Sequence, residues 1–263
     1  MIKIGCNFLS LKDTNVEDFI RIAFDLNLDC VDFHQRAFES PEDPTYLSGV
    51  KMLCLRYGLP IGYIGCSPTF VGNRQERAEG LQTCKEAVDL AAFLGSPIIR
   101  VFCGTMPEKN GDGDEPWPPM ISCYQEIADY AATKGIHVGL QNHPSSGDEM
   151  MLIRSQTGRP NFDFVMDTGQ WVGSYGAYHK GETPEVDFYK FMEQTAPHAM
   201  YVRTKFYDIN SGVEKLLDYE RIVPILKKIK YNGCISIVYE GVEEDRVDQV
   251  RKAASYLRTL LAA

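Results

Sequence analysis

Short apolar segments alternate along this chain with longer stretches that carry apolar residues at helical spacing. The short segments predict strands at residues 2–6, 30–34, 60–65, 97–103, 136–141, 162–167, 200–205 and 234–240. The longer stretches predict helices at residues 16–26, 45–57, 74–94, 120–134, 146–156, 185–195, 219–230 and 245–261. The last of these has a clear core stripe, formed by Val247, Val250, Ala254, Leu257 and Leu261.

This regular alternation predicts the fold class. Eight βα units of about 33 residues each match a (β/α)8 TIM barrel, which needs about 250 residues, so we expect residues 1–263 to form one domain. A doubly wound open sheet is the alternative. It normally carries a glycine-rich phosphate loop after an early strand, and the chain contains neither GxGxxG nor GxxxxGK[ST].

One segment, NFDFVMDTGQW at residues 161–171, ends a predicted strand on a carboxylate. Every second position of this segment up to Asp167 is apolar, as in a strand whose two faces have different surroundings, and Gly169 then ends the strand. An acid at the carboxyl end of a barrel strand is typical of a functional site. The structural alternative is an aspartate that caps a helix or a turn. Neighbouring strands repeat the pattern, which favours the site.

The strands also show which side chains face the barrel interior, because the face towards the helices must be apolar. The residues that alternate with these apolar ones point into the barrel. Near the carboxyl ends of the strands they are polar, and together they predict one pocket. Its ionised members are three acids and three bases, so the pocket is expected to be balanced in charge; a purely structural salt-bridge network is the alternative. The inward polar residues are Asp32, His34, Arg100, Gln141, His143, Asp167, Arg203, Lys205 and Glu240.

Two long connections follow predicted strands, at residues 104–119 and 172–184. In a barrel both would lie on the face that carries the active site, where they are candidate lids. Trp117 is expected to cover a substrate there, although an aromatic residue of this kind can instead pack against the rim.

Composition excludes several classes of protein. A net charge of −9 and a pI near 5.1 argue against a nucleic-acid binder, which needs a basic face. No apolar run approaches 18 residues, and no signal peptide opens the chain. Eight cysteines without a CxxC spacing indicate free thiols in a reducing compartment. We therefore expect a soluble cytoplasmic protein with neither a nucleic-acid nor a membrane partner.

Several motifs resemble one family. They are RVFCGTMPE (residues 100–108), GLQNH (139–143), MDTGQ (166–170), RTKFYD (203–208), DYERIVPILKKIKYNG (218–233) and SIVYEG (236–241). These resemble the xylose isomerase-like TIM barrels, the sugar phosphate isomerase/epimerase superfamily. The resemblance covers nearly the whole chain and implies the same eight-unit barrel.

The resemblance implies a divalent metal held by Glu, Asp, His and Glu at the ends of strands five to eight. Only Asp167 matches that set, because Gln141, Arg203 and Val238 occupy the other positions. Arginine cannot bind a cation and valine offers no lone pair, so we expect no tightly bound cofactor. The alternative is a rebuilt site for Mn, Mg or Zn, formed by Asp167, Glu240, His143 and Gln141.

The resemblance also implies proton transfer next to the carbonyl of a small polyol or keto sugar. Arg203 and Lys205 would then supply the positive charge that a metal normally provides, with Glu240 or His143 as the proton carrier. The expected substrate-binding residues are His34, Arg100, Gln141 and Trp117. The alternative is a non-catalytic sugar-binding barrel with a degenerate site. Either protein would have a small carbohydrate as its partner, and both are compatible with a homo-oligomer.

Overall fold

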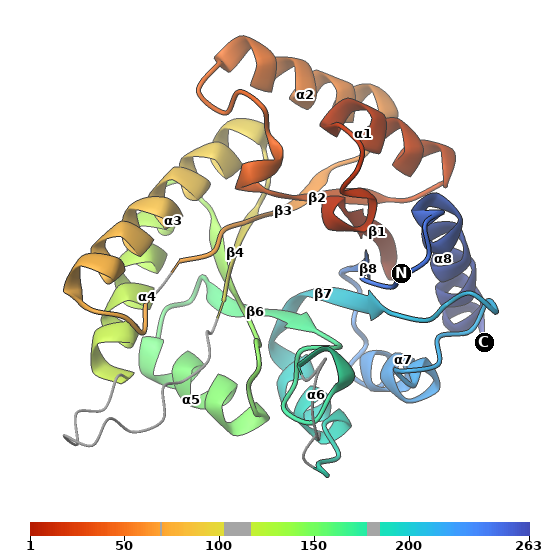
Figure 1. Cartoon of the computed structure of the whole chain (residues 1–263). Coiled ribbons are helices and arrows are strands. Elements are labelled where there is room, and N and C mark those ends of the chain that lie inside the picture. Colours follow the sequence, from red (N-terminus) through yellow and green to blue (C-terminus); the bar gives the residue numbers. More distant parts are fainter. Residues whose placement is uncertain (69, 103–116, 178–184) are drawn as a thin grey trace.

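The computed structural model describes residues 1–68, 70–102, 117–177 and 185–263, except for the side chains of Trp117 and Pro118. Within these residues eight parallel strands close into a barrel in the order β1 to β8, and helices surround it (Figure 1). The prediction of a single-domain TIM barrel is therefore confirmed. The strands are β1 Lys3–Asn7, β2 Cys30–His34, β3 Ile61–Gly65, β4 Ile98–Phe102, β5 His137–Gln141, β6 Phe162–Asp167, β7 Ala199–Phe206 and β8 Cys234–Tyr239.

The helices begin and end where local chemistry requires it. They are α1 Val16–Asp25, α2 Pro44–Tyr57, α3 Arg74–Leu94, α4 Trp117–Ala132, α5 Gly147–Thr157, α6 Tyr189–Thr195, α7 Tyr219–Lys228 and α8 Arg246–Ala262. Asn73 and Glu76 form a capping box at the start of α3, and Gly95 ends that helix in the left-handed conformation.

Helix α6 is shorter than predicted, because it begins at Tyr189 and not at residue 185. The nearby acid Asp187 does not cap a helix at residue 185; it forms an ion pair with Arg221 of α7 at 2.9 Å. No side chain caps the start of α6 itself. The sequence pattern shows the apolar spacing of the helix but not this competing partner.

The core has two parts. A large cluster fills the layer between the strands and the helices, and a smaller one, formed by Cys30, Tyr63, Ile98, Val165 and Tyr201, lies inside the barrel. The rings of Tyr63 and Tyr201 meet edge to face, with their centroids 5.2 Å apart. The inner cluster is the floor beneath the carboxyl ends of the strands.

Strand β3 contains an irregularity that bears on the site. Its pairing with β2 shifts from Val31 opposite Ile61 to Phe33 opposite Ile64, so one residue of β2 faces two of β3. Gly62 and Tyr63 therefore both point into the barrel. A Cβ at Gly62 would lie 2.5 Å from Tyr201 Oη, and the Tyr63 side chain belongs to the inner cluster. The bulge brings the Tyr63 hydroxyl into reach of the polar groups above it.

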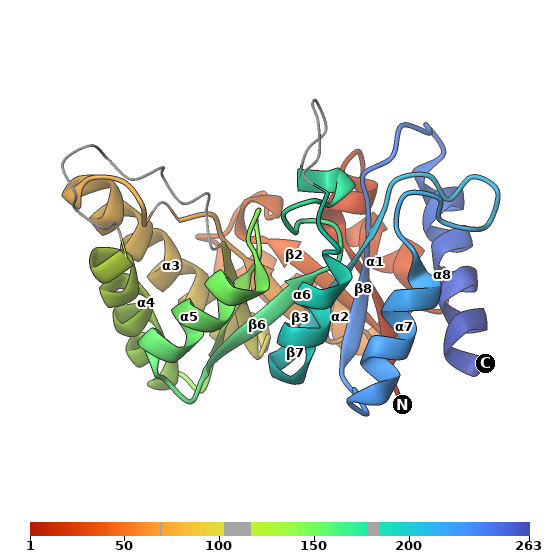
Figure 2. The same cartoon turned by 90° about the horizontal axis from the view of Figure 1, so that it is seen from below.

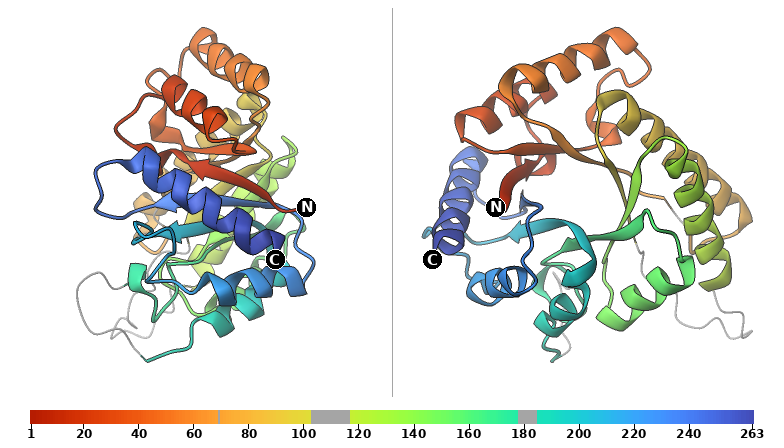
Figure 3. Two further views of the ribbon diagram at one scale, coloured as in Figure 1. Left: turned by 90° about the vertical axis from the view of Figure 1, so that its right-hand side faces the viewer. Right: turned by 180° about the vertical axis from the view of Figure 1, so that it is seen from behind.

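The connections that follow β6, β7 and β8 lie on one side of the barrel, and both chain ends lie on the opposite side (Figure 2). Two further views place the chain ends near each other (Figure 3). Among the described residues, no helix is long and apolar enough to cross a membrane. The seven cysteines within these residues are free thiols.

Candidate active site

A cavity of about 350 Å³ opens at the carboxyl ends of the strands. It lies above the floor of the barrel, where active sites of this fold are found. Of the predicted pocket residues, His34, Arg100, Gln141, His143, Arg203, Lys205 and Glu240 line it. The rest of its lining is formed by Asn7, Leu9, Ser67, Phe102 and Gln170. Five different strands or their ends thus supply the predicted residues, as the shared parity of the strands requires.

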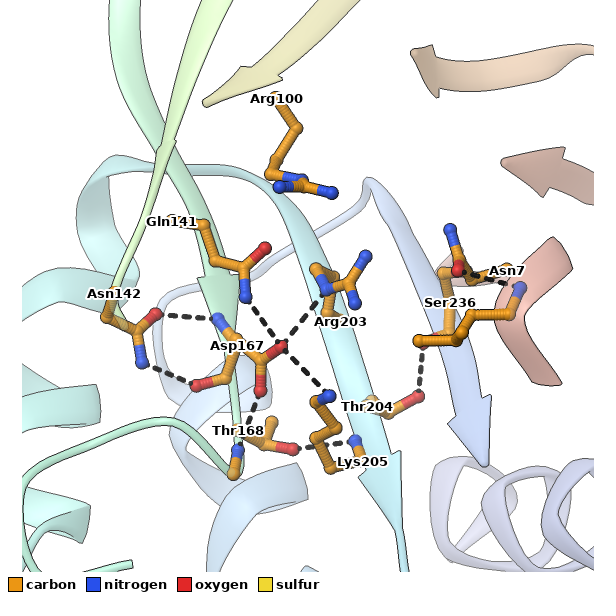
Figure 4. A network of polar contacts seen from close by, with 12 residues as sticks. Asn7, Arg100, Gln141, Asn142, Asp167, Thr168, Arg203, Thr204, Lys205 and Ser236 are labelled. Atoms are coloured by element: carbon orange, nitrogen blue, oxygen red, sulfur yellow. Dashed lines mark hydrogen bonds and ion pairs between the residues drawn. The ribbon is translucent and has the colours of Figure 1, made fainter. Parts of the chain in front are cut away.

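Asp167 does not line the cavity. Its carboxylate lies behind two of the lining side chains and has no exposed surface. Gln141 Nε2 and Arg203 Nε donate to Oδ2 at 3.1 and 3.0 Å, and the Gly169 amide donates to Oδ1 at 2.9 Å (Figure 4). The contact with the Gly169 amide is the turn contact that a purely structural aspartate would make. The contacts with Gln141 and Arg203 also hold the polar groups of the site in place.

The backbone of Asp167 is held separately from its side chain. The Asn142 amide accepts a hydrogen bond from Asp167 N at 2.8 Å and donates one to Asp167 O at 2.9 Å. The ladder between β5 and β6 has ended by this point, since its last pair is Leu140 with Phe164. The Asn142 side chain thus takes the place of a further backbone pair between the two strands. It fixes the backbone position from which the Asp167 carboxylate extends.

Arg203 and Lys205 bring two cations to the carboxylates. Arg203 Nη1 donates to the Tyr63 hydroxyl, while Lys205 Nζ donates to Glu240 and lies 3.9 Å from Asp167 Oδ2. Arg203 and Lys205 are at most 4% exposed. Buried ions of this kind are stable only when they are paired, and here each cation contacts a carboxylate.

Local contacts hold Lys205 in place. Thr168 Oγ1 accepts from Lys205 N at 2.9 Å, and the Tyr219 hydroxyl donates to Lys205 O at 2.6 Å. The side chain passes close to Gly169, where an added Cβ would lie 2.8 Å from Lys205 Cγ. Glycine at position 169 therefore leaves the space that the lysine occupies on its way to the cavity.

Both histidines of the cavity are neutral near pH 7. Burial, together with Arg100 and other nearby cations, lowers the pKa of His34 to about 4. Burial also lowers the pKa of His143, whose ring packs against Phe102 with the centroids 4.7 Å apart. A neutral imidazole can accept a proton, so His143 is chemically able to act as a base.

Asp32 corrects the predicted charge balance. It lies in the floor and not in the cavity, and its Oδ1 accepts a hydrogen bond from the Tyr201 hydroxyl at 2.7 Å. Burial raises the pKa of Asp32 to about 7, so much of it is protonated at neutral pH. Asp32 thus lies below the cavity, and among the described residues the charges around the cavity are those of Arg100, Arg203 and Lys205 against Asp167 and Glu240.

Two of the positions expected to hold a divalent metal have other partners or lack a donor atom in this structure. Both oxygens of Asp167 already accept hydrogen bonds, and Arg203 donates to one of them. Val238 is fully buried and has no donor atom. Within the described residues, no three His, Cys, Asp or Glu side chains are arranged to hold a metal ion.

Sequence reasoning missed Tyr63, whose hydroxyl accepts from Arg203 and, at 2.9 Å, from Asn7 Nδ2. It also missed Ser67, which lies 3.1 Å from His34 Nε2. The two glycines beside Tyr63 in GYIG were the available clue, because glycine within a strand often marks a bulge. The side chain of Trp117 lies outside the described residues, as do positions 104–116 and 178–184 of the two predicted lids.

Solved structures of sugar epimerases share this fold. An L-ribulose 3-epimerase superposes with a TM-score of 0.80 at 15% identity, covering 100% of this chain and 95% of that one. A D-allulose 3-epimerase from Methylomonas sp. in complex with D-allulose gives 0.75 at 19% identity, covering 98% and 96%. A 3-keto-D-glucoside 4-epimerase from E. coli gives 0.78 at 16%, covering 98% and 100%. At these identities the likeness shows the fold alone.

No curated protein sequence matches the chain. A family model does match it, over residues 20–260, and that family is described as the xylose isomerase-like TIM barrel. The match spans all of the strands except β1 and all of the residues around the cavity except Asn7 and Leu9. The chain therefore belongs to the family of xylose isomerase-like TIM barrels.

Proposed function

We propose that this protein is an isomerase or epimerase that moves a proton next to the carbonyl of a small keto sugar, and that Arg203 and Lys205 replace the divalent metal that the family resemblance implies. One observation carries the proposal. Two cations, a carboxylate and a neutral imidazole converge on one cavity of a size suited to a small molecule. Sugar epimerases are among the solved structures that share this fold, which is compatible with this reaction class.

The chemistry follows from these positions. A base removes the proton from the carbon beside the carbonyl, and the electron pair moves onto the carbonyl oxygen. Arg203 and Lys205 stabilise the resulting enediolate, because their charges are buried and fixed in place before the reaction. Glu240 or His143 carries the proton. A proton delivered to the other face of the same carbon gives an epimer. A proton delivered to the former carbonyl carbon, together with transfer of the neighbouring hydroxyl proton to the former carbonyl oxygen, gives an isomer.

Arg203 also explains why a metal would bind weakly. Its Nε lies 3.0 Å from Asp167 Oδ2, so the carboxylate that would hold a metal already has a cation beside it. Like unit charges about 4 Å apart repel by roughly 4 kcal/mol at an effective dielectric of 20. A repulsion of that size weakens binding by about three orders of magnitude. The loss of carboxylate ligands at Gln141 and Val238 acts in the same direction.

The test is solvent exchange without metal. Protein purified without chelator is analysed for Mn, Mg, Co and Zn, dialysed against EDTA, and incubated in D2O with a panel of keto sugars followed by NMR. We expect deuterium to enter at least one sugar at a rate that EDTA does not change. Glu240→Gln or His143→Asn should abolish exchange, depending on which of the two residues carries the proton, whereas the surface variant Glu126→Gln should not. Near-stoichiometric metal on Asp167, with exchange lost on its removal, would overturn the replacement of the metal.

The non-catalytic alternative has one observation in its favour. Asp167 pairs with Arg203, and Lys205 pairs with Glu240, so these charges neutralise one another without a substrate. A sugar-binding barrel would bind members of the same panel and leave every C–H bond unexchanged. The deuterium experiment therefore separates the two functions.

A further inference from the structure

Arg100 is the cation of the cavity that forms no ion pair with an acid within the described residues. Its guanidinium is buried, with 4% of the residue exposed. Nη1 donates to the Cys66 carbonyl at 3.2 Å, Nε is buried without a partner, and Cζ lies 4.1 Å from the centre of the Phe102 ring. A guanidinium has five N–H donors, so most of its capacity is unused.

The other charges of the cavity do not compensate for it. Asp167 contacts Arg203 and Lys205, and Glu240 contacts Lys205, so both carboxylates are already shared with other cations. In Figure 4 the guanidinium of Arg100 points towards the heads of Gln141 and Arg203, into the polar region of the site. In the part of the chain that the structure describes, three cations thus face two carboxylates at this site. Burying an ion without a partner costs free energy. A protein tolerates this cost where a ligand supplies the opposite charge.

A hydrogen-bond donor lies on the same side of the cavity. The Arg36 amide donates to His34 Nδ1 at 3.2 Å, and His34 is neutral, so its proton is on Nε2. That Nε2–H donates to Ser67 Oγ at 3.1 Å. The Ser67 hydroxyl proton then has no acceptor among the described residues and can be given to a ligand.

We propose that the substrate is an anionic keto sugar, whose carboxylate or phosphate group binds Arg100 and Ser67. This inference rests on the proposed function and adds the substrate class to it. The anionic group lies on the Arg100 side of the cavity, and the carbon that exchanges its proton lies on the Lys205 side. Arginine is suited to either anion, because its planar fork matches both in a bidentate manner.

The test compares three matched sugars by calorimetry at physiological salt: a ketohexose, its 6-carboxylate and its 6-phosphate. We expect one anion to bind about 10- to 100-fold more tightly than the neutral sugar, the range for a hydrogen bond to a charged group. The two charged sugars show whether a carboxylate or a phosphate is the group recognised. Arg100→Met should remove this preference, and Ser67→Ala should reduce it.

Arg36→Met is the matched control, because it removes an exposed arginine close to His34 and should leave the preference intact. If Arg100→Met does not fold, Arg100→Lys keeps the charge without the fork and should show an intermediate preference. Equal binding of the neutral and charged sugars by the unaltered protein, or a preference that survives Arg100→Met, would overturn the inference. Exchange confined to neutral sugars would leave the proposed function intact, whereas anion preference without any exchange would remove the function alone.

Discussion

Replacing Lys205 by methionine separates a catalytic lysine from a structural one. The variant keeps a chain of similar length in the space beside Gly169 and removes the charge that contacts Glu240. If Lys205 stabilises the enediolate, its loss should reduce kcat by about 10²- to 10³-fold, the effect of removing one preorganised donor. The KM should change less, because the interaction strengthens only as negative charge develops.

The cost in stability should be modest, although Lys205 is only 2% exposed. Asp167 keeps the three donors from Gln141, Arg203 and Gly169. Glu240 has a side chain that is 25% exposed, so water can replace the lysine there. We therefore expect the free energy of unfolding to fall by about 1–2 kcal/mol. This is less than the 3–5 kcal/mol that removing one partner of a fully buried ion pair costs. For a chain of this size that lowers the Tm by roughly 2–8 °C.

The assay is deuterium exchange on the best sugar of the panel, with the Tm measured on the same samples. Lys252→Met on α8 is the control, because it removes a surface lysine that pairs with Asp248 at 2.9 Å. Full exchange activity in Lys205→Met would refute the role of the lysine in stabilising the oxyanion. A collapse of the Tm well beyond the expected range would show that the lysine acts mainly as a structural ion.

Two further predictions concern the floor and the Arg100 side of the cavity. Asp32 binds its proton more tightly when folded, with a pKa of about 7 against an ordinary 3.8, so its contribution to stability is lost as the pH rises through this window. Asp32→Asn should remove that loss. In urea unfolding at pH 8 its free energy of unfolding should exceed that of the unaltered protein by a few kcal/mol, but not at pH 4. The same dependence of the unfolding free energy on pH in both proteins would contradict this. At Gly65 an added Cβ would lie 2.5 Å from Arg100 Nη2, so Gly65→Ala should displace the guanidinium and lower the preference for anionic sugars with little change in Tm; an unchanged preference would show that the guanidinium position is not critical.

The barrel could be predicted well because its pattern is repeated and local. Every strand end lies within one residue of the prediction, since apolar runs and the glycines between them mark both sides. The helix starts are less accurate, because α4 begins three residues before its predicted start and α6 begins four residues after it. Near the start of α6, Asp187 pairs with Arg221 of α7, a residue that lies far along the chain. Pairings of that kind have no local pattern, so periodicity cannot show them.

The site could be predicted as a set of inward positions but not as a network. Alternation placed Arg203, Lys205 and Glu240 on one face, and the cavity brings them together. It could not place Tyr63, because the bulge in β3 breaks the period of two. It also treated Asp32 as ionised, since the depth of a side chain within the barrel is a property of the assembled floor.

The clamp that Asn142 forms on the backbone of Asp167 has an evolutionary consequence. The aspartate is positioned by its neighbouring strand at both its N–H and its C=O, so its place does not depend on what its carboxylate binds. Arg203 lies opposite Asp167 in the β6–β7 ladder, so its guanidinium reaches the carboxylate without disturbing the contacts that hold the backbone of the aspartate. Such an arrangement allows a substitution on an adjacent strand to change the partner of the carboxylate while Asn142 keeps its backbone in place.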